Sequence, residues 1–138
     1  MKQFKINLLL ILLLFVISSN AQKRKVNIKV NKLTDHIYML KGQGGNIGLF
    51  VGEDGVFMID DQFAPLTKKI LAAIKTVTNK PVKYLINTHW HGDHTGGNLN
   101  MAKTGAVIVS HENVRKRMSM DQVVRGNTKK ASPKQALP

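Results

Sequence analysis

The feature that most constrains the fold of this chain is a histidine-rich segment directly after an apolar, strand-like run. Three of the five histidines and one aspartate fall within six positions as H-x-H-x-D-H: His89, His91, Asp93 and His94. Side chains two positions apart in an extended segment point to one side, so His89 and His91 are within reach of one cation. Gly92 permits a turn, after which Asp93 and His94 approach from a second direction. The spacing predicts a metal site with room for two ions.

The ligand types indicate which metal such a site would hold. Neutral imidazole together with carboxylate suits Zn²⁺ first, and iron and manganese are alternatives because ligand type alone does not fix a transition metal. The chain has no cysteine, which excludes thiolate zinc fingers, disulfide scaffolds and cysteine nucleophiles. The competing interpretation, a set of solvent-exposed loop histidines, does not require this order of residues.

The first 21 residues have the pattern of a secretory signal peptide. Lys2 and Lys5 precede an uninterrupted apolar run at residues 8–17, and the small side chains of Ser19 and Ala21 follow. This run is half of the roughly 20 residues that a transmembrane helix needs, so we expect cleavage after Ala21. An uncleaved membrane anchor is the alternative. The expected location of the remaining chain is the periplasm or the outside of the cell.

Basic residues strongly outnumber acidic ones. The chain has 21 lysines and arginines against 8 aspartates and glutamates, a formal net charge of +13 that attracts anions in general. The basic residues are scattered and no aromatic stacking pattern lies among them, which favours solvated faces over a nucleic-acid site. We therefore expect no specific nucleic-acid partner, and no membrane contact beyond the signal peptide.

Hydrophobic periodicity after the signal peptide predicts a mixed α+β domain. The glycine-rich loop at residues 42–46 lacks the spacing of a dinucleotide-binding loop. The expected strands are residues 26–30, 36–40, 47–51, 56–59, 82–87 and 106–109, and the expected helices are residues 65–77, 98–103 and 111–118, the last with Ser110 as N-cap. The predicted organisation is a signal peptide at 1–21, a domain at 22–120 and a basic tail at 121–138 that is frayed or disordered.

Together with the motif, three further segments resemble the metallo-β-lactamase superfamily of binuclear metallohydrolases. They are the loop Gly44-Gly45-Asn46, the hairpin end Met58-Ile59-Asp60 and the run at residues 81–88 that leads into the motif. The resemblance covers most of residues 33–118. It implies an αββα sandwich, of which this sequence contains the first half: antiparallel hairpins, then helix, strand, metal loop, helix, strand and helix.

The resemblance also implies roles for individual residues. His89 and His91 would bind the first metal, and Asp93 and His94 would bind the second. Asp93 would also contact the nucleophilic water, which makes it the candidate catalytic residue. Asp60, taken alone, is the polar end of a hairpin strand, and the resemblance makes it a residue that braces the motif loop from behind the ligands.

The family's second half, which supplies a further histidine to each metal and an aspartate that bridges them, is not in this sequence. The remaining histidines do not replace it: His111 is interpreted as a helix cap or surface residue, and His36 opens a strand far from the motif. Each metal would keep two strong ligands instead of the three of an open catalytic zinc site. We therefore expect the missing half, or an oligomer partner, to complete the site.

Three functions are compatible with these patterns. The first is an exported metal-dependent hydrolase of a small-molecule substrate, in which the metal lowers the pKa of bound water; this chain alone is expected to be poorly active. The second is a non-catalytic, basic secreted domain that binds anionic surfaces. The third is an iron-dependent oxidoreductase of the same fold. Members of the family open β-lactams, lactones, thioesters and phosphodiesters, and the sequence does not choose among them.

Overall fold

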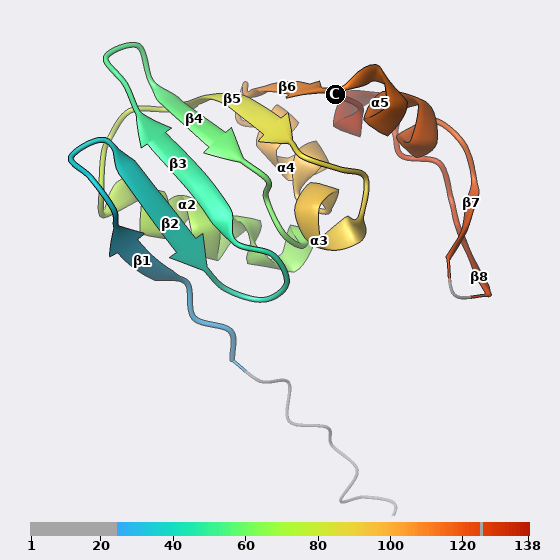
Figure 1. Cartoon of the computed structure of the whole chain (residues 1–138), viewed down its shortest axis with the longest axis horizontal. Helices are drawn as coiled ribbons and strands as arrows, with labels where there is room; N and C mark the ends of the chain where they lie inside the picture. Colours follow the sequence, from blue (N-terminus) through green and yellow to red (C-terminus); the bar gives the residue numbers. More distant parts are fainter. Residues whose placement is uncertain (1–24, 125) are drawn as a thin grey trace, which may run out of the picture.

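A computed structural model describes residues 25–124 and 126–138, and its main body is one six-stranded sheet (Figure 1). The strands lie side by side in chain order. The first four pair antiparallel, whereas the last three run parallel to one another. Their bounds are β1 Lys29–Lys32, β2 Ile37–Lys41, β3 Ile47–Val51, β4 Val56–Ile59, β5 Val82–Asn87 and β6 Val107–Ser110.

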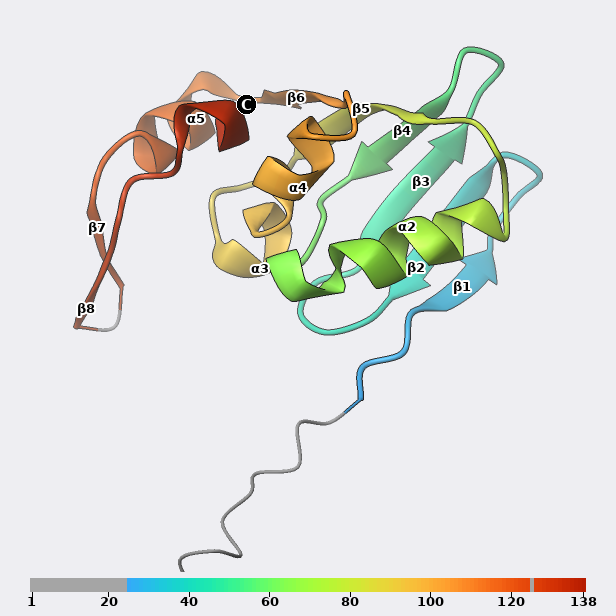
Figure 2. The same cartoon turned by 180° about the vertical axis from the view of Figure 1, so that it is seen from behind.

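Helices cover one face of this sheet. Figure 2 shows α2 (Thr67–Lys75) and α4 (Asn98–Ala102) on the same side of the sheet, with the 3-10 turn η1 (Ala64–Leu66) leading into α2. Ile70 and Ile74 lie one helical turn apart on α2, and both belong to the buried cluster that contains Leu49 and Leu85 of the sheet. This packing fixes β5, and therefore the point at which the histidine motif begins.

The opposite face of the sheet is apolar, and no helix within residues 25–124 and 126–138 covers it. Phe50, Phe57 and Tyr84 form a row across three strands, with ring centroids 6.2 and 5.1 Å apart. The large apolar side chains of this face that are 42–54% exposed are Ile37, Phe50, Ile59, Val107 and Val109. A contiguous patch of this kind is typical of an interaction surface.

The mixed α+β class and the predicted half-sandwich order of elements are confirmed, but the start of the first strand and the cap of the last predicted helix were predicted wrongly. β1 begins at Lys29 instead of residue 26, and the carbonyl of Val26 accepts a hydrogen bond from Lys69 Nζ (2.6 Å) instead of from a neighbouring strand. The helix α5 (Glu112–Met118) is capped by His111, whose Nδ1 accepts from the Asn113 amide (3.1 Å), and not by Ser110. The interpretation of His111 as a cap is thus confirmed.

The segment after residue 120 contains regular structure: β7 (Gln122–Val124) pairs with β8 (Asn127–Lys129), and the 3-10 turn η2 (Lys134–Ala136) follows. The Asp121 carboxylate accepts from the Ala131 amide (2.9 Å) and from Lys130 Nζ (2.7 Å). Asn98 Nδ2 donates to the carbonyl of Ala136 (2.9 Å), which ties η2 to α4. The prediction of a frayed or disordered tail was wrong, because polar contacts of this kind leave no hydrophobic periodicity in the sequence.

The predicted signal peptide, residues 1–21, lies outside the described residues, and the domain boundaries at residues 21 and 120 stay predictions. In the part of the chain that the structure describes, no helix combines the length and the apolar character that crossing a bilayer requires.

Candidate metal centre

The histidine motif follows β5: His89 and His91 lie in the bend after that strand, and Asp93 and His94 lie in the short helix α3 (Gly92–Thr95). The carbonyl of His91 accepts from the amides of His94 (3.0 Å) and Thr95 (3.1 Å) and from the Thr95 hydroxyl (3.0 Å). These hydrogen bonds fold the second half of the motif back toward the first. The sequence predicts a loop here, because a single helical turn is too short to show a periodic pattern.

The turn brings three imidazole rings of the motif together. The ring centroid of His89 lies 4.7 Å from that of His91 and 3.9 Å from that of His94. Burial, followed by the charges of the neighbouring His94 and His91, lowers the pKa of His89. A lowered pKa favours neutral imidazole, which is the form that binds a metal.

Asp60 joins the motif to β4. It is buried directly after that strand, with a backbone φ of 61° in the left-handed region. Oδ1 accepts from the Thr88 amide (2.9 Å), and Oδ2 accepts from the Thr88 hydroxyl (2.8 Å) and lies 2.7 Å from His94 Nδ1. Because a carboxylate only accepts, Nδ1 carries the hydrogen in this pair, and the lone pair of His94 Nε2 is left for a ligand.

His94 Nε2 and Asp93 Oδ2 lie 3.4 Å apart. Two atoms that each lie about 2.1 Å from one tetrahedral zinc ion are about 3.4 Å apart, so this pair fits a common metal. Among the described residues, no group of three or more His, Asp or Glu side chains is placed to hold a metal ion. Asp93 and His94 therefore fit a metal ion as two of its ligands. A complete coordination sphere requires further ligands.

A buried amide pair holds the motif from the side of the core. Asn87 Nδ2 donates to the carbonyl of His94 (3.2 Å) and to Asn98 Oδ1 (3.1 Å), and Asn98 Nδ2 donates back to Asn87 Oδ1 (2.8 Å). Sequence reasoning missed this pair. The only indication of this pair in the sequence is Asn87, a polar residue at the end of an apolar strand. A buried amide at such a position needs hydrogen-bond partners.

Asp61 is a buried carboxyl group beside the motif that sequence reasoning also missed. Its amide donates to the carbonyl of His94 (3.1 Å), and its Oδ1 accepts from the Gly97 amide (2.9 Å). Oδ2 is buried without a hydrogen-bond partner among the described residues. Burial raises the pKa of Asp61 to about 7, and the hydrogen bond from Gly97 opposes this shift.

We expect Asp61→Asn to flatten the pH dependence of stability of the metal-free protein. The pKa of Asp61 is about 7 in the folded chain against an ordinary 3.8, so folding disfavours the ionised form. The free energy of unfolding of the parent should therefore fall, by up to about 4 kcal/mol, as the pH rises from about 4 to 7. Asparagine keeps an acceptor for Gly97 but does not ionise, so the variant should be more stable than the parent at pH 8.

Urea unfolding between pH 4 and pH 8 in the presence of EDTA measures this difference. Asp54→Asn, on the exposed turn between β3 and β4, is the matched control and should keep the slope of the parent. An Asp61→Asn protein with the same slope as the Asp54→Asn protein would contradict the assignment.

Gly45 brings the loop between β2 and β3 against the motif. A Cβ at this position would lie 2.5 Å from Cε1 and 2.8 Å from Nε2 of His94. Gln62 fastens the same loop, because its Nε2 donates to the Gly45 carbonyl and its Oε1 accepts from the Gln43 amide (3.2 Å). Gln62 is buried with φ 56°, and no pattern in the sequence marks it as a site residue.

Gly45→Ala is expected to destabilise the protein by about 1–3 kcal/mol and to weaken metal binding, because a methyl group does not fit between the loop and the imidazole of His94. Gly48→Ala is the control, since its Cβ would meet the Ile59 side chain at an ordinary 3.4 Å. Urea unfolding and zinc titration of both variants test this prediction. Equal stability and equal zinc affinity of the two would show that the close approach of the loop has no consequence.

A pocket of about 360 Å³ opens over the second half of the motif. It is built from the motif, from the residue before η1 and from the β7–β8 hairpin. Its lining residues are Phe63, Trp90, His91, Gly92, Asp93, Val124 and Lys129. A small molecule in this pocket would lie against Asp93.

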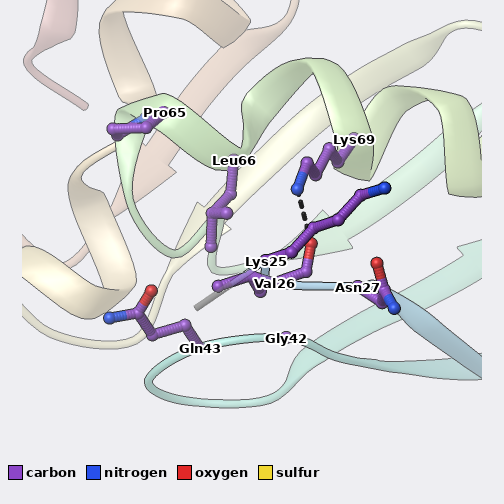
Figure 3. A pocket seen from close by; sticks show the side chains of 8 residues that line it. All are labelled: Lys25, Val26, Asn27, Gly42, Gln43, Pro65, Leu66 and Lys69. Atoms are coloured by element: carbon purple, nitrogen blue, oxygen red, sulfur yellow. Dashed lines mark hydrogen bonds between the residues drawn. The ribbon is translucent and has the colours of Figure 1, made fainter. Parts of the chain in front are cut away.

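A separate groove of about 880 Å³ lies between residues 25–27, the glycine loop and the start of α2 (Figure 3). Lys25 and Lys69 line it, and the hydrogen bond from Lys69 Nζ to Val26 fixes the N-terminal segment there. No residue of the motif lines this groove, so it is distinct from the candidate metal centre.

Comparison with known proteins decides the family. The family model described as the metallo-beta-lactamase superfamily matches residues 40–135, which include Asp60 and the whole motif. The chain belongs to the metallo-β-lactamase superfamily. The match also extends through the β7–β8 hairpin, beyond residues 33–118, which carry the resemblance.

Two curated members of the superfamily match shorter segments. The chain is 33% identical over 79 residues to beta-lactamase-like protein 2 homolog of Caenorhabditis elegans, covering 49% of this chain and 26% of that protein. It is 41% identical over 44 residues to hydroxyacylglutathione hydrolase of Erythrobacter litoralis, covering 31% of this chain and 18% of that protein. The superfamily thus includes hydrolases, and this chain spans about a quarter or less of these two relatives.

Solved metallo-β-lactamases share the fold. BJP-1 of Bradyrhizobium japonicum, a subclass B3 enzyme, superimposes with a TM-score of 0.62 at 28% identity, covering 71% of this chain and 38% of that one. FIM-1 of Pseudomonas aeruginosa in its mono-zinc form also gives a TM-score of 0.62, at 21% identity, covering 70% of this chain and 47% of that one. The chain therefore corresponds to less than half of each solved enzyme.

Proposed function

We propose that this chain carries one half of the active site of an exported, metal-dependent hydrolase that acts on a small molecule. The observation that carries the proposal is the pair of His94 Nε2 and Asp93 Oδ2, 3.4 Å apart beside the imidazoles of His89 and His91. Zn²⁺ suits these donors best, with iron and manganese as alternatives. The names of the relatives, which include a hydroxyacylglutathione hydrolase and metallo-β-lactamases, support hydrolysis as the reaction class.

The residues of this chain would act as follows. His89 and His91 would hold one metal, and Asp93 and His94 a second. A divalent metal so held supplies Lewis acidity and lowers the pKa of a water molecule. Asp60 orients His94 through a hydrogen bond with Nδ1, so that Nε2 would be free to bind the metal. Asp93 lines the pocket over the motif, where its carboxylate can accept a hydrogen bond from the attacking water and orient it.

The remaining ligands would come from a second half-domain or from a partner chain. The exposed apolar face of the sheet supports this part of the proposal, because a second sheet packed on it would remove Phe50 and its apolar neighbours from water. With two ligands per metal and an incompletely positioned water, the chain alone would turn over slowly, since a displacement of about 1 Å already costs about 100-fold in rate.

Hydrolysis by the zinc-loaded chain of residues 22–138 tests the proposal. The substrates are a lactam, a thioester and a phosphodiester. We expect slow hydrolysis of at least one of them, removed by EDTA and by Asp93→Ala but not by the matched Asp54→Ala. Bound zinc without any EDTA-sensitive hydrolysis would favour a binding domain instead. Turnover in the ordinary enzymatic range of about 1–1000 s⁻¹ would contradict the need for a second half.

The export part of the proposal rests on the signal-peptide pattern of residues 1–21. Intact-mass analysis of exported protein should give a mature N-terminus at Gln22. Recovery of the complete chain in the membrane fraction would contradict it.

A further inference from the structure

The β7–β8 hairpin carries a lysine to the mouth of the candidate site. Lys129 Nζ lies 3.4 Å from the carbonyl oxygen of Trp90 and 5.6 Å from the centroid of the Trp90 ring. Lys129 Nζ also lies 4.0 Å from the position that a Cβ on Gly92 would occupy. Gly92 directly precedes Asp93 in the chain. The ammonium group and the carboxylate of Asp93 therefore border the same 360 Å³ pocket.

The charge of Lys129 is not neutralised by the part of the protein that the structure describes. No carboxylate within residues 25–124 and 126–138 lies within ion-pair distance of its Nζ. The neighbouring Lys130, in contrast, is exposed and pairs with Asp121 at 2.7 Å. Lys129 is half-buried, and burial lowers its pKa. An ammonium group that has lost part of its hydration without gaining a counter-ion is stabilised when an anion binds beside it.

The rest of the pocket is suited to an apolar group. Phe63, Trp90 and Val124 are half-buried and present aromatic and aliphatic surface to it. Arg117 lies over Trp90 as well, with Cζ 5.6 Å from the ring centroid, and so contributes to a positive potential at this end of the molecule. The overall charge of +13 acts in the same direction. The pocket thus combines an apolar wall, one unpaired cation and the proposed catalytic carboxylate.

We propose that Lys129 binds the carboxylate of a small, partly apolar substrate and so orients that substrate over Asp93 and His91. This inference rests on the proposed function and gives its substrate class: a monoanionic organic acid derivative, whose carboxylate meets Lys129 and whose apolar part meets Phe63, Trp90 and Val124. A single ammonium group matches one negative charge, whereas binding of a phosphate monoester typically uses several donors or a guanidinium fork.

Trp90 is the one tryptophan of the chain and lines this pocket, so its fluorescence reports on binding there. The test is a fluorescence titration of metal-free protein in EDTA with phenylacetate and with its neutral isostere phenylacetamide. Absence of metal ensures that the carboxylate is not bound by zinc. We expect phenylacetate to bind about 10-fold more tightly than phenylacetamide. Equal affinity of the two probes for the parent protein would overturn the proposal without recourse to any variant.

Substitutions identify the side chain that makes phenylacetate bind more tightly than phenylacetamide. Lys129→Met should remove the preference for phenylacetate, Lys129→Arg should keep most of it, and Lys130→Met should behave as the parent. If Lys129→Met still binds phenylacetate more tightly than phenylacetamide, the carboxylate is attracted by Arg117 or by the net positive charge of the protein. This result would overturn the role of Lys129. Loss of the preference in Lys130→Met to the same extent would overturn it too. Because the readout needs neither metal nor turnover, the result is independent of whether the chain hydrolyses anything.

Discussion

The double replacement of His89 and His91 by alanine is expected to abolish specific zinc binding at the first site and to lower total zinc affinity by at least about 100-fold. These two imidazoles are the only ligands that the resemblance gives to that site within this chain. Removing His89 also removes the ring that contacts both His91 and His94, with centroids 4.7 and 3.9 Å away. Metal that remains would be held by the Asp93 and His94 pair alone, and two ligands make a weak site.

Competition with a chromogenic chelator at pH 7.5 measures this loss. The matched control is the double variant His36→Ala and His111→Ala, which removes two histidines outside the motif and should keep the zinc affinity of the parent. Zinc affinity should also fall between pH 7 and pH 5 in the parent, because protonated imidazole does not bind a metal. Equal zinc affinity of the two double variants would contradict the ligand assignment.

Replacement of Asp60 by asparagine is expected to weaken zinc binding by about 10–100-fold although the proposed ligand set does not include Asp60. Its two oxygens accept three hydrogen bonds, from the Thr88 amide, the Thr88 hydroxyl and His94 Nδ1. An amide has one oxygen, and where its NH₂ group takes the position of Oδ2, His94 Nδ1 loses its acceptor and faces that NH₂ group instead. His94 is then free to rotate or to change tautomer, and its Nε2 no longer stays 3.4 Å from Asp93 Oδ2.

The asparagine substitution isolates this effect from backbone strain. Asp60 has φ 61°, a conformation that asparagine adopts readily, so the fold should survive. Far-ultraviolet circular dichroism checks the fold, and zinc titration measures the affinity, with Asp54→Asn as the control on an exposed turn. Unchanged zinc affinity in a folded Asp60→Asn protein would show that the contact with His94 does not position a ligand.

The fold could be predicted wherever one face of an element is buried. The hairpin at residues 47–51 and 56–59 and the strand at residues 82–87 were predicted with the bounds that the structure shows, because each is a short, largely apolar run bounded by turn residues. The helix was expected from residue 65, and the structure divides this stretch into η1 and α2 with Ile70 and Ile74 buried.

The site was only partly predictable because its support is polar. The four motif residues are visible in the sequence, and Asp60 was found through the resemblance alone. Asp61 and Gln62 follow Asp60 directly, yet Gln62 contacts the loop at Gly45 and Asp61 contacts the amide of Gly97, 17 and 36 residues away in the chain. The β7–β8 hairpin, which places Lys129 by the motif, is held by Asp121 and by pairing of its own backbone. Contacts of this kind have no period and no local signature.

Native mass spectrometry of residues 22–138, titrated with zinc at neutral pH, tests most directly whether this chain carries a metal centre. We predict saturable binding of one or two zinc ions to the parent, at the same stoichiometry after His36 and His111 are replaced by alanine. The variant without His89 and His91 should bind at most one ion, and the further removal of Asp93 should leave none. A parent protein that binds no zinc, or the same number of ions in all of these proteins, would contradict the assignment of the motif as a metal site.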